Sequence, residues 1–314
     1  MLVSFIIVNY NTGGILKDCL ESVYKFEKEI KYEIIIVDNS SSDDSKTIIE
    51  NIASARNNIK TIFLNEKISF SAANNKGYEL SSGEYILIMN PDIIFTEPVL
   101  KKLTDDLRDN KGLGAVSPLL TGSDGNFQRA YFQRYPSLMQ FILFYSVLGN
   151  IFQKNKKLVY KYQENGDIDT GSNKIEDTDQ IPCAFFMTEK EIFEKAGKMD
   201  PGYFLFFEDV DLSYQINKMF KLGVDTSLRV THLGGSSFKT SDDYWLYGRF
   251  IIGMITFFNK NYTRGKTVTL KITAILNSNL IVLTEKVKKI FRTEDDYRLR
   301  KHQYFLNELK KTNL

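Results

Sequence analysis

Short apolar runs and segments of helical periodicity alternate along the first part of the chain. Between the runs, apolar residues recur at every third or fourth position, as in 15–24, which is the spacing of one helix face. The order β-α-β-α-β-α-β predicts an α/β fold in which helices cover both faces of a mainly parallel, Rossmann-like sheet. The predicted strands are 3–8, 33–37, 61–64 and 85–89.

The chain beyond residue 118 is less regular. An aromatic and basic stretch, 127–136, precedes an apolar helical segment and a polar run, 163–180, that we expect to form a mobile loop. After His232 the sequence is aromatic, basic and helical to its end. The other predicted elements are a strand at 181–187, a helix from about Glu189 and a strand at 224–231.

Each of the first four predicted strands ends in polar residues that are able to bind a ligand. Ligands of open α/β sheets bind outside the carboxyl ends of the strands, so the recurrence favours a nucleotide-type crevice. The alternative is a series of ordinary turns, in which Asn and Asp are common. No dinucleotide-binding or P-loop glycine motif accompanies them. The residues are Asn9, Asn11, Asp38, Asn39, Asn65, Asn90 and Asp92.

Asp92 follows a buried strand through the turn Asn90-Pro91, where a metal or a phosphate would be handled. The alternative is a turn in which Pro91 fixes φ and Asp92 caps a helix. His232, at the end of a predicted strand and beside a glycine pair, is a second candidate metal ligand. A purely structural histidine is the alternative.

Glu208, Asp209 and Asp211 directly follow the apolar run 203–207. An apolar setting raises the pKa of a carboxyl group and prepares it as a general base. If a helix begins at about Glu208, its first two residues point about 100° apart, so both do not face one site. The alternative is that these acids only complement the helix dipole.

Charge and cysteine content narrow the class of protein. The chain has 41 Lys and Arg against 39 Asp and Glu, a net charge of +2, so no nucleic-acid partner is expected. Cys19 and Cys183 form neither a zinc motif nor a disulfide framework, which indicates a reducing compartment. Without signal-peptide features or a long uncharged apolar run, we expect a cytoplasmic protein with no spanning helix.

Six short motifs occur in order: Val8-Asn9-Tyr10-Asn11, Val37-Asp38-Asn39-Ser40-Ser41, Ala73-Asn74-Asn75-Lys76-Gly77, Asn90-Pro91-Asp92, Phe207-Glu208-Asp209-Val210-Asp211 and His232-Leu233-Gly234-Gly235-Ser236-Ser237. Together they resemble family 2 glycosyltransferases, specifically the bacterial rhamnosyltransferase-like branch, over roughly residues 1–260. The resemblance implies a GT-A fold. It divides the chain into a nucleotide-sugar-binding half (1–118), an acceptor-binding and catalytic half (119–240) and a helical C-terminal extension (241–314).

The resemblance also implies roles for particular residues. Asp92 and His232 would bind Mg²⁺ or Mn²⁺ across the donor diphosphate, Asp209 would be the catalytic base, and Glu208 would position the acceptor. Asn90 stands where the family usually has aspartate, which is a stronger metal ligand than the neutral amide. The residues implied to bind the uracil or thymine base and the rest of the nucleotide sugar are Val8, Tyr10, Asn11, Asp38, Asn65, Asn74, Asn75 and Asn90.

The activity implied is inverting, metal-dependent transfer of one sugar to a glycan or polyprenyl-linked saccharide in the synthesis of cell wall, capsule or O-antigen. The Gln-x-x-Arg-Trp motif of processive relatives is absent. dTDP-rhamnose is the favoured donor, with UDP-hexoses and UDP-N-acetylhexosamines as alternatives. A non-catalytic nucleotide-sugar-binding protein and a nucleotidyltransferase are the other classes. The basic C-terminal region is either a helical cap or a peripheral contact with the inner face of the plasma membrane, and homo-oligomerisation stays open.

Overall fold

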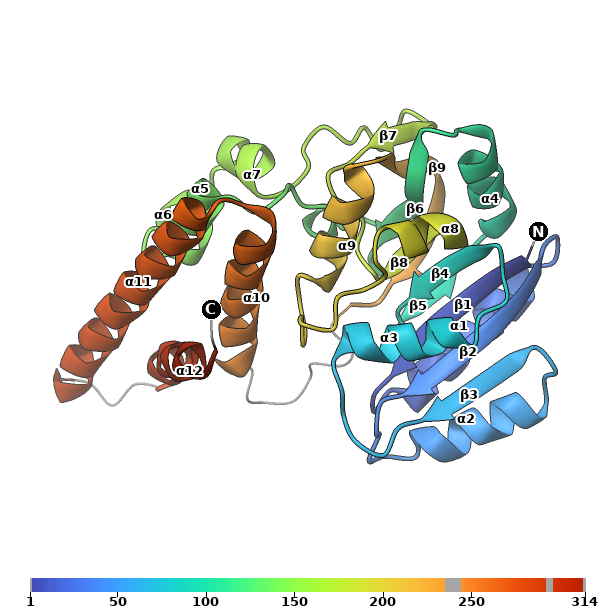
Figure 1. The fold of residues 1–314 in the computed structure, drawn as a ribbon, viewed down its shortest axis with the longest axis horizontal. Helices are drawn as coiled ribbons and strands as arrows, with labels where there is room; N and C mark the ends of the chain where they lie inside the picture. The colour runs from blue at the N-terminus through green and yellow to red at the C-terminus, as the bar shows by residue number, and fades with distance from the viewer. Residues whose placement is uncertain (1, 235–243, 292–295, 313–314) are drawn as a thin grey trace. The chain divides into compact units, whose positions relative to one another are not determined.

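The computed structural model describes residues 2–234, 244–291 and 296–312, which divide into two compact units (Figure 1). We call the first the sheet unit; it consists of Met1–Tyr135, Glu164–Gly202 and Glu208–Lys239. We call the second the helical unit; it consists of Pro136–Gln163, Tyr203–Phe207 and Thr240–Leu314. Their boundaries follow compactness, so the predicted functional division at residues 118 and 240 stays a prediction.

One sheet runs through the sheet unit, in the order β3-β2-β1-β4-β8-β6-β9-β5, with β7 paired to β9. The strands β3, β2, β1 and β4 are mutually parallel, whereas β8 runs antiparallel to both β4 and β6. The described strands are β1 Leu2–Asn9, β2 Lys31–Asp38, β3 Ile59–Phe63, β4 Tyr85–Met89, β5 Ile93–Phe95, β6 Leu113–Thr121, β7 Ile175–Asp177, β8 Phe185–Glu189 and β9 Lys221–His232.

Helices cover both faces of this sheet. Alternate residues of β1 point to opposite faces: Phe5 joins the core that includes the apolar face of α1, and Ile6 lies under α3. A Cβ added to Gly77 of α3 would lie 2.6 Å from the Ile6 side chain, so only glycine allows this close approach. The helices of the unit are α1 Gly13–Phe26, α2 Ser45–Ser54, α3 Phe70–Glu79, α4 Leu100–Asp109, α8 Lys190–Lys195 and α9 Glu208–Asn217, besides a 3₁₀ turn, η1, at Arg129–Tyr131. The predicted α/β fold is confirmed.

The polar run 163–180 is not the free loop that its composition predicted. It contains β7, which pairs antiparallel with β9, and Ile168 within it is buried. The Arg129 guanidinium donates to the carbonyl oxygens of Asn165 (2.6 Å) and Ile168 (3.1 Å). The predicted strand at 181–187 also begins later, at Phe185. Both differences come from tertiary partners that local sequence does not show.

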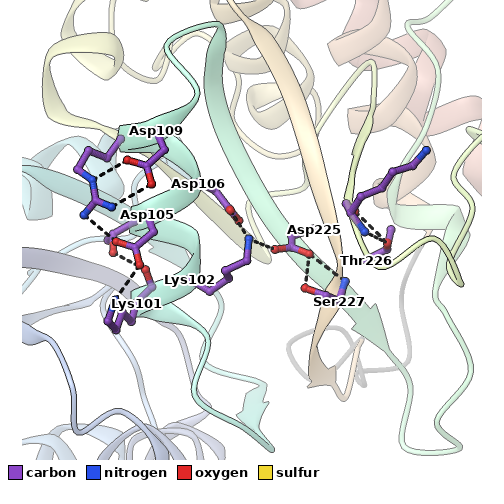
Figure 2. Close-up of polar contacts among 11 residues, drawn as sticks. Lys101, Lys102, Asp105, Asp106, Asp109, Asp225, Thr226 and Ser227 are labelled. Carbon is purple, nitrogen blue, oxygen red and sulfur yellow. Dashed lines mark hydrogen bonds and ion pairs between the residues drawn. The ribbon is translucent and has the colours of Figure 1, made fainter.

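A polar cluster joins α4 to the part of β9 that precedes its pairing with β5 (Figure 2). The Lys102 ammonium lies 3.1 Å from the buried Asp225 carboxylate and also contacts Asp106. Asp225 in turn accepts hydrogen bonds from the backbone and hydroxyl of Ser227, at 2.9 and 2.6 Å. The register between β6 and β9 shifts at Asp225, so the cluster holds the irregular part of β9 that leads to His232.

The helical unit consists of short helices followed by three long ones. Close packing of α10 on α12 requires Gly248, where an added Cβ would lie 2.7 Å from the Tyr304 ring. Its elements are α5 Leu138–Gln140, the π-helical turn η2 Phe141–Tyr145, α6 Gly149–Phe152, α7 Lys156–Tyr162, α10 Tyr244–Asn261, α11 Arg264–Phe291 and α12 Tyr297–Lys311. The predicted helical C-terminal extension is confirmed.

Within the described residues, one segment of α11 differs from the expectation that no helix could span a membrane. Arg264–Lys289 is long and apolar enough to cross a membrane on length and composition alone, with a mean hydropathy of 1.4 and 33% of its most apolar window buried. The polar positions Asn277 and Glu285 break the apolar run but do not lower the average enough to exclude it. A core helix of a soluble protein can have the same properties.

Candidate active site

The carboxyl ends of β1 and β2 lie side by side, since Asn9 pairs with Asp38 in the parallel ladder. Asn9 Nδ2 donates to Asp38 Oδ1 (2.8 Å), and Ser41 donates to the same carboxylate through its hydroxyl (2.6 Å) and its N–H (3.0 Å). A carboxylate has about four acceptor positions, so Asp38 keeps capacity for one further donor. The sequence indicated Asp38 but did not reveal the contribution of Ser41.

Two residues in left-handed backbone conformations shape the loops after these strands. Asn11 has φ 52° and Ser40 has φ 63°. Asn11 N–H donates to the Ser41 hydroxyl (2.9 Å), and its Oδ1 accepts from Ser42 N–H (2.8 Å). The Asn11 side chain therefore fixes the loops to each other, and its contribution to ligand binding would come through a backbone group.

The other predicted donor-binding residues differ in how much of their side chain is free. The Asn75 amide is occupied by the backbone of Met199, at 2.7 and 3.3 Å. Asn74 donates to the Phe70 carbonyl (2.9 Å), while its own Oδ1 is buried without a partner. Of the remaining four, Val8 is buried, Tyr10 lies under the Lys67 ammonium (3.5 Å from the ring centroid), Asn65 is exposed and Asn90 is half-buried.

Strand pairing brings Asp92 to His232. Ile93 of β5 pairs with His232 of β9, and Leu233 N–H donates to the Asp92 carbonyl (3.0 Å). Both side chains are buried, and His232 Nε2 lies 3.5 Å from Asp92 Oδ1. Two residues that are far apart in sequence thus lie next to each other, and the metal-binding role that the resemblance implied for them stays a prediction.

Gln128 determines which nitrogen of His232 carries the proton. Gln128 Nε2 donates to the His232 carbonyl (2.9 Å), which fixes the orientation of the amide and directs Oε1 at Nδ1 (2.8 Å). Because Oε1 only accepts, Nδ1 must be the donor, and neutral His232 presents the Nε2 lone pair to Asp92. Tyr131 packs edge-on against the imidazole, 4.6 Å between ring centroids. The sequence analysis missed Gln128, which lies in the aromatic and basic stretch.

The residues at this position fit a divalent cation. Asp92 Oδ1 is buried and accepts no hydrogen bond, and it faces His232 Nε2, which is also an acceptor in the neutral imidazole with its proton on Nδ1. A metal ion between them satisfies both, and Gln128 then has the usual role of a residue that orients a histidine ligand. The described residues contain no cluster of three or more His, Cys, Asp or Glu suited to a metal. Further ligands would have to be substrate oxygens or water.

Glu208 and Asp209 begin α9, as the apolar-to-acidic switch predicted. Glu208 is buried with no partner for Oε2, and burial together with the Asp209 charge raises the pKa of Glu208. Asp209 is half-buried; burial raises its pKa, and a hydrogen bond from Val210 N–H (2.8 Å) opposes the shift. A raised pKa of a buried carboxyl group is typical of general bases, so both acids are candidates for that role.

The backbone just before α9 turns sharply. Phe206 and Phe207 have φ 67° and 71°, a left-handed conformation that bulky residues rarely adopt. Such residues persist where the surroundings hold them, and Phe207 is held by the rings of Phe250 (5.1 Å) and Phe257 (6.2 Å). The backbone therefore changes direction between the apolar run and the acids that follow it.

The segment Cys183–Ala184 links the two chemical centres. Asn90 N–H donates to the Ala184 carbonyl (3.1 Å), directly before Asp92. Burial raises the pKa of the Cys183 thiol, and the charges of Asp209 and Glu208 raise it further, which places that thiol beside both acids. The metal-fitting pair and the acid pair therefore flank the same short segment at one edge of the sheet unit. The sequence analysis did not place Cys183 in the candidate site.

Comparison with known proteins finds similarity to glycosyltransferases. Glycosyltransferase GlyG of Streptococcus pneumoniae is 30% identical over 128 residues, which are 40% of this chain and 42% of the relative. Poly-beta-1,6-N-acetyl-D-glucosamine synthase of Staphylococcus epidermidis is 30% identical over 117 residues, 37% of this chain and 27% of that protein. The match therefore spans less than half the length of either curated relative.

Among solved structures, mannosyltransferase PcManGT from Pyrobaculum calidifontis, in complex with GDP-Man and Mn²⁺, gives a TM-score of 0.56 at 11% identity. The match covers 98% of this chain and 86% of that one, and it shows a shared fold, which is the expected GT-A fold. The family model described as Glycosyl transferase family 2 matches residues 4–195. Because that match extends over more than half of the sequence, the chain belongs to glycosyl transferase family 2.

Proposed function

We propose that this protein transfers a single sugar from a nucleotide-sugar donor to a hydroxyl group of a glycan or polyprenyl-linked acceptor, with inversion of configuration. The observation that carries the proposal is the pair Asp92–His232, whose two buried acceptor atoms face each other at 3.5 Å. It lies at the edge of the sheet where Asp38 keeps a free acceptor position. Residues 1–118 would bind the donor, and 119–240 would supply the catalytic acids.

The reaction needs one proton acceptor and one means of stabilising the leaving diphosphate. Bound Mg²⁺ or Mn²⁺, held by Asp92 and His232, would neutralise charge on the diphosphate. Asp209 takes the proton of the acceptor hydroxyl as its oxygen forms a bond to the anomeric carbon. The bond from that carbon to the phosphate oxygen breaks, and its electron pair leaves with the diphosphate. One displacement on the opposite face inverts the anomeric centre.

Asp38 supports a donor whose base offers an N–H group. A thymine or uracil N3–H would occupy the acceptor position that Asn9 and Ser41 leave open. We favour dTDP-rhamnose, with UDP-hexoses and UDP-N-acetylhexosamines as competing donors. A thermal-shift screen of these donors and GDP-mannose, each with and without Mn²⁺, measures the preference, because a ligand of the native state raises its apparent stability. Stabilisation by GDP-mannose alone contradicts the pyrimidine assignment.

The metal role is tested by Asp92→Ala. In calorimetric titrations, wild-type protein should bind the preferred donor more tightly with Mn²⁺ than without it, and the variant should lose that difference. Asp124→Ala is a matched control, since Asp124 is an exposed carboxylate in a turn of the sheet unit. Unchanged metal dependence in Asp92→Ala would remove Asp92 from the site.

We also propose that the outward face of α11 contacts an anionic membrane surface from the cytoplasmic side. Its single acid, Glu285, is half-buried and paired with Lys288 (3.0 Å) and Arg298 (3.4 Å), whereas exposed cations lie towards both ends of the helix. An apolar face bordered by cations fits anionic lipid. The exposed apolar residues of this face are Val268, Ile272, Leu276, Leu280, Leu283 and Val287.

Leu276 and Leu283 are the most exposed residues of that face, at 64% and 61%, so their double change to Asp tests the contact with little effect on the core. Sedimentation with phosphatidylglycerol vesicles should fall sharply in this variant and in high salt. Leu80→Asp, an exposed position after α3, is the control. If wild-type protein does not sediment with vesicles but dimerises through this face in sedimentation velocity, the partner of the face is a second copy of the chain and not a membrane.

A further inference from the structure

The helical unit contains a pocket of about 600 Å³ that the proposed chemistry does not use. Segments of η2, α6, α10 and α12 line it, together with Phe206 and one residue of α11. Its size is in the range of small-molecule sites. The lining residues that matter here are Tyr145, Phe206, Tyr247, Phe250, Arg298 and Lys301.

The charged groups of this pocket are cations. Arg298 and Lys301 lie one turn apart on α12, and the Arg298 guanidinium has a carboxylate at 3.4 Å in Glu285. The Lys301 ammonium lies 4.6 Å from the ring centroid of Tyr247 and has no carboxylate partner in the described part of the chain. Burial, with the Arg298 charge as a second cause, lowers the pKa of Lys301. An anion beside Lys301 would offset both the burial of its ammonium group and the repulsion from Arg298.

The neighbouring His302 does not add a third charge. It is buried, and its Nδ1 lies 3.0 Å from the Ser278 hydroxyl. Burial, followed by the charges of Lys301 and Arg298, lowers the pKa of His302 to about 3, so the imidazole is neutral at physiological pH. The pocket therefore presents one unpaired ammonium and one paired guanidinium to whatever enters it, which fits phosphate oxygens.

The rest of the lining is aromatic and amide-bearing. Phe250 packs against Tyr145 (4.8 Å between centroids) and Phe206 (6.0 Å), which makes a continuous aromatic wall. Asn150 and Gln153 also line the pocket and supply amide groups. Such a wall fits an isoprenoid chain or a sugar ring attached to the phosphate, and would exclude a bare, fully hydrated anion as the best ligand.

We propose that this pocket binds the phosphate or diphosphate group of the acceptor substrate through Lys301 and Arg298, with the aromatic wall against the group that the phosphate carries. The inference rests on the proposed function, because it names the acceptor of the same reaction. Phe206 connects the pocket to the catalytic acids along the backbone. It lines the pocket and lies two residues before Glu208, in the left-handed turn that precedes α9.

Direct binding to the full chain is the first test, and it does not require activity. The only tryptophan, Trp245, precedes the lining residue Leu246, so its fluorescence reports on the pocket. Farnesyl diphosphate should bind tightly to wild-type protein and at least tenfold more weakly to Lys301→Gln. Lys310→Gln, an exposed position on the same helix, should bind as wild type. Equal affinity in wild type and Lys301→Gln would overturn the proposal.

Two further arms separate the possible sources of the anion. Inorganic diphosphate should bind more weakly than farnesyl diphosphate; equal binding would reduce the site to a phosphate site and reject the acceptor assignment. Phosphatidylglycerol vesicles that displace farnesyl diphosphate completely would make the ligand a lipid headgroup instead. Asn150→Asp, at an exposed lining position, places a carboxylate in the pocket and should weaken farnesyl diphosphate binding without removing a cation.

Donor hydrolysis distinguishes failure of this inference from failure of the proposed function. Transfer of the sugar to water needs only the donor site, so Lys301→Gln should hydrolyse the donor at the wild-type rate while its KM for a polyprenyl-diphosphate acceptor rises at least tenfold. Wild-type protein without any donor hydrolysis or transfer would reject the proposed function, yet farnesyl diphosphate binding would still decide whether the pocket exists as a site. An unchanged acceptor KM would reject the pocket alone.

Discussion

Asp38 and Glu208 are both buried carboxyl groups of the sheet unit, but their surroundings are opposite. Asp38 accepts three hydrogen bonds, from Asn9 and from two groups of Ser41. Glu208 has an oxygen with no partner and a raised pKa. A carboxylate satisfied by fixed donors is organised to hold a ligand, whereas one that is poorly satisfied is organised to exchange a proton. The comparison separates a binding side from a reacting side of one candidate site.

The largest expected effect comes from the reacting side. Asp209→Asn keeps the size of the side chain but removes the proton acceptor, so we expect a loss of about 10²–10⁴ in transfer rate. The binding side should be unaffected, and donor affinity by calorimetry should match the wild type. Full activity in this variant would remove Asp209 from the mechanism, and lost donor affinity would break the division between the two sides.

Gln128 gives the next largest effect, on the binding side. Gln128→Ala removes the acceptor that holds the proton on His232 Nδ1, and such partners of metal-bound histidines typically contribute 10–100-fold in metal affinity. Electron paramagnetic resonance titration of Mn²⁺ in the presence of donor measures the change. Gln133→Ala, in the same stretch, is the control, because the Gln133 side chain donates to the Ala130 carbonyl (3.0 Å) and not to His232. Equal Mn²⁺ affinity in the two variants would contradict the tautomer argument.

The binding side was predictable from sequence where it depends on strand order. Apolar runs separated by helical segments predict a parallel sheet, and parallel strands place Asn9, Asp38 and Asn90 at one edge. Pairing of β5 with β9 was not predictable by spacing, because Asp92, just before β5, and His232, at the end of β9, are far apart in the sequence. Their association came from resemblance of motifs, and the structure supplied the register.

The features that the sequence analysis missed depend on contacts between residues that are far apart in the sequence. Gln128 is 104 positions from His232, and nothing in its local pattern distinguishes it from neighbouring polar residues. Cys183 was considered only as a possible zinc or disulfide residue, yet its thiol lies beside Asp209 and Glu208. The strand β7 was hidden in a polar run because its partner, β9, determines its structure. Local composition does not contain these tertiary partners.

A pH profile sharpens the comparison within the reacting side. The pKa of Asp209 is raised, so the transfer rate should increase as pH rises through that pKa and the base form appears. Burial, followed by the Asp209 charge, raises the pKa of Glu208, so an ionised Asp209 favours the protonated form of Glu208. Glu208→Gln should therefore leave the acidic limb of kcat/KM where it is. A large loss of transfer rate in this variant, with the acidic limb gone, would identify Glu208 as the base.

The smallest effect on activity is expected from the cluster that supports β9. Burial raises the pKa of Asp106 to about 6 from 3.8, with Lys102 opposing and Asp225 adding to the shift. A carboxyl group whose pKa is higher in the folded state stabilises the fold below about pH 4, and this contribution is lost as pH rises to about 6. Asp106→Asn removes the titration, so wild-type stability should decline relative to the variant between these pH values, by roughly 1–3 kcal/mol. Urea unfolding at pH 4, 5 and 7 measures the difference. A constant difference would show that the Lys102 ammonium keeps Asp106 ionised throughout this pH range.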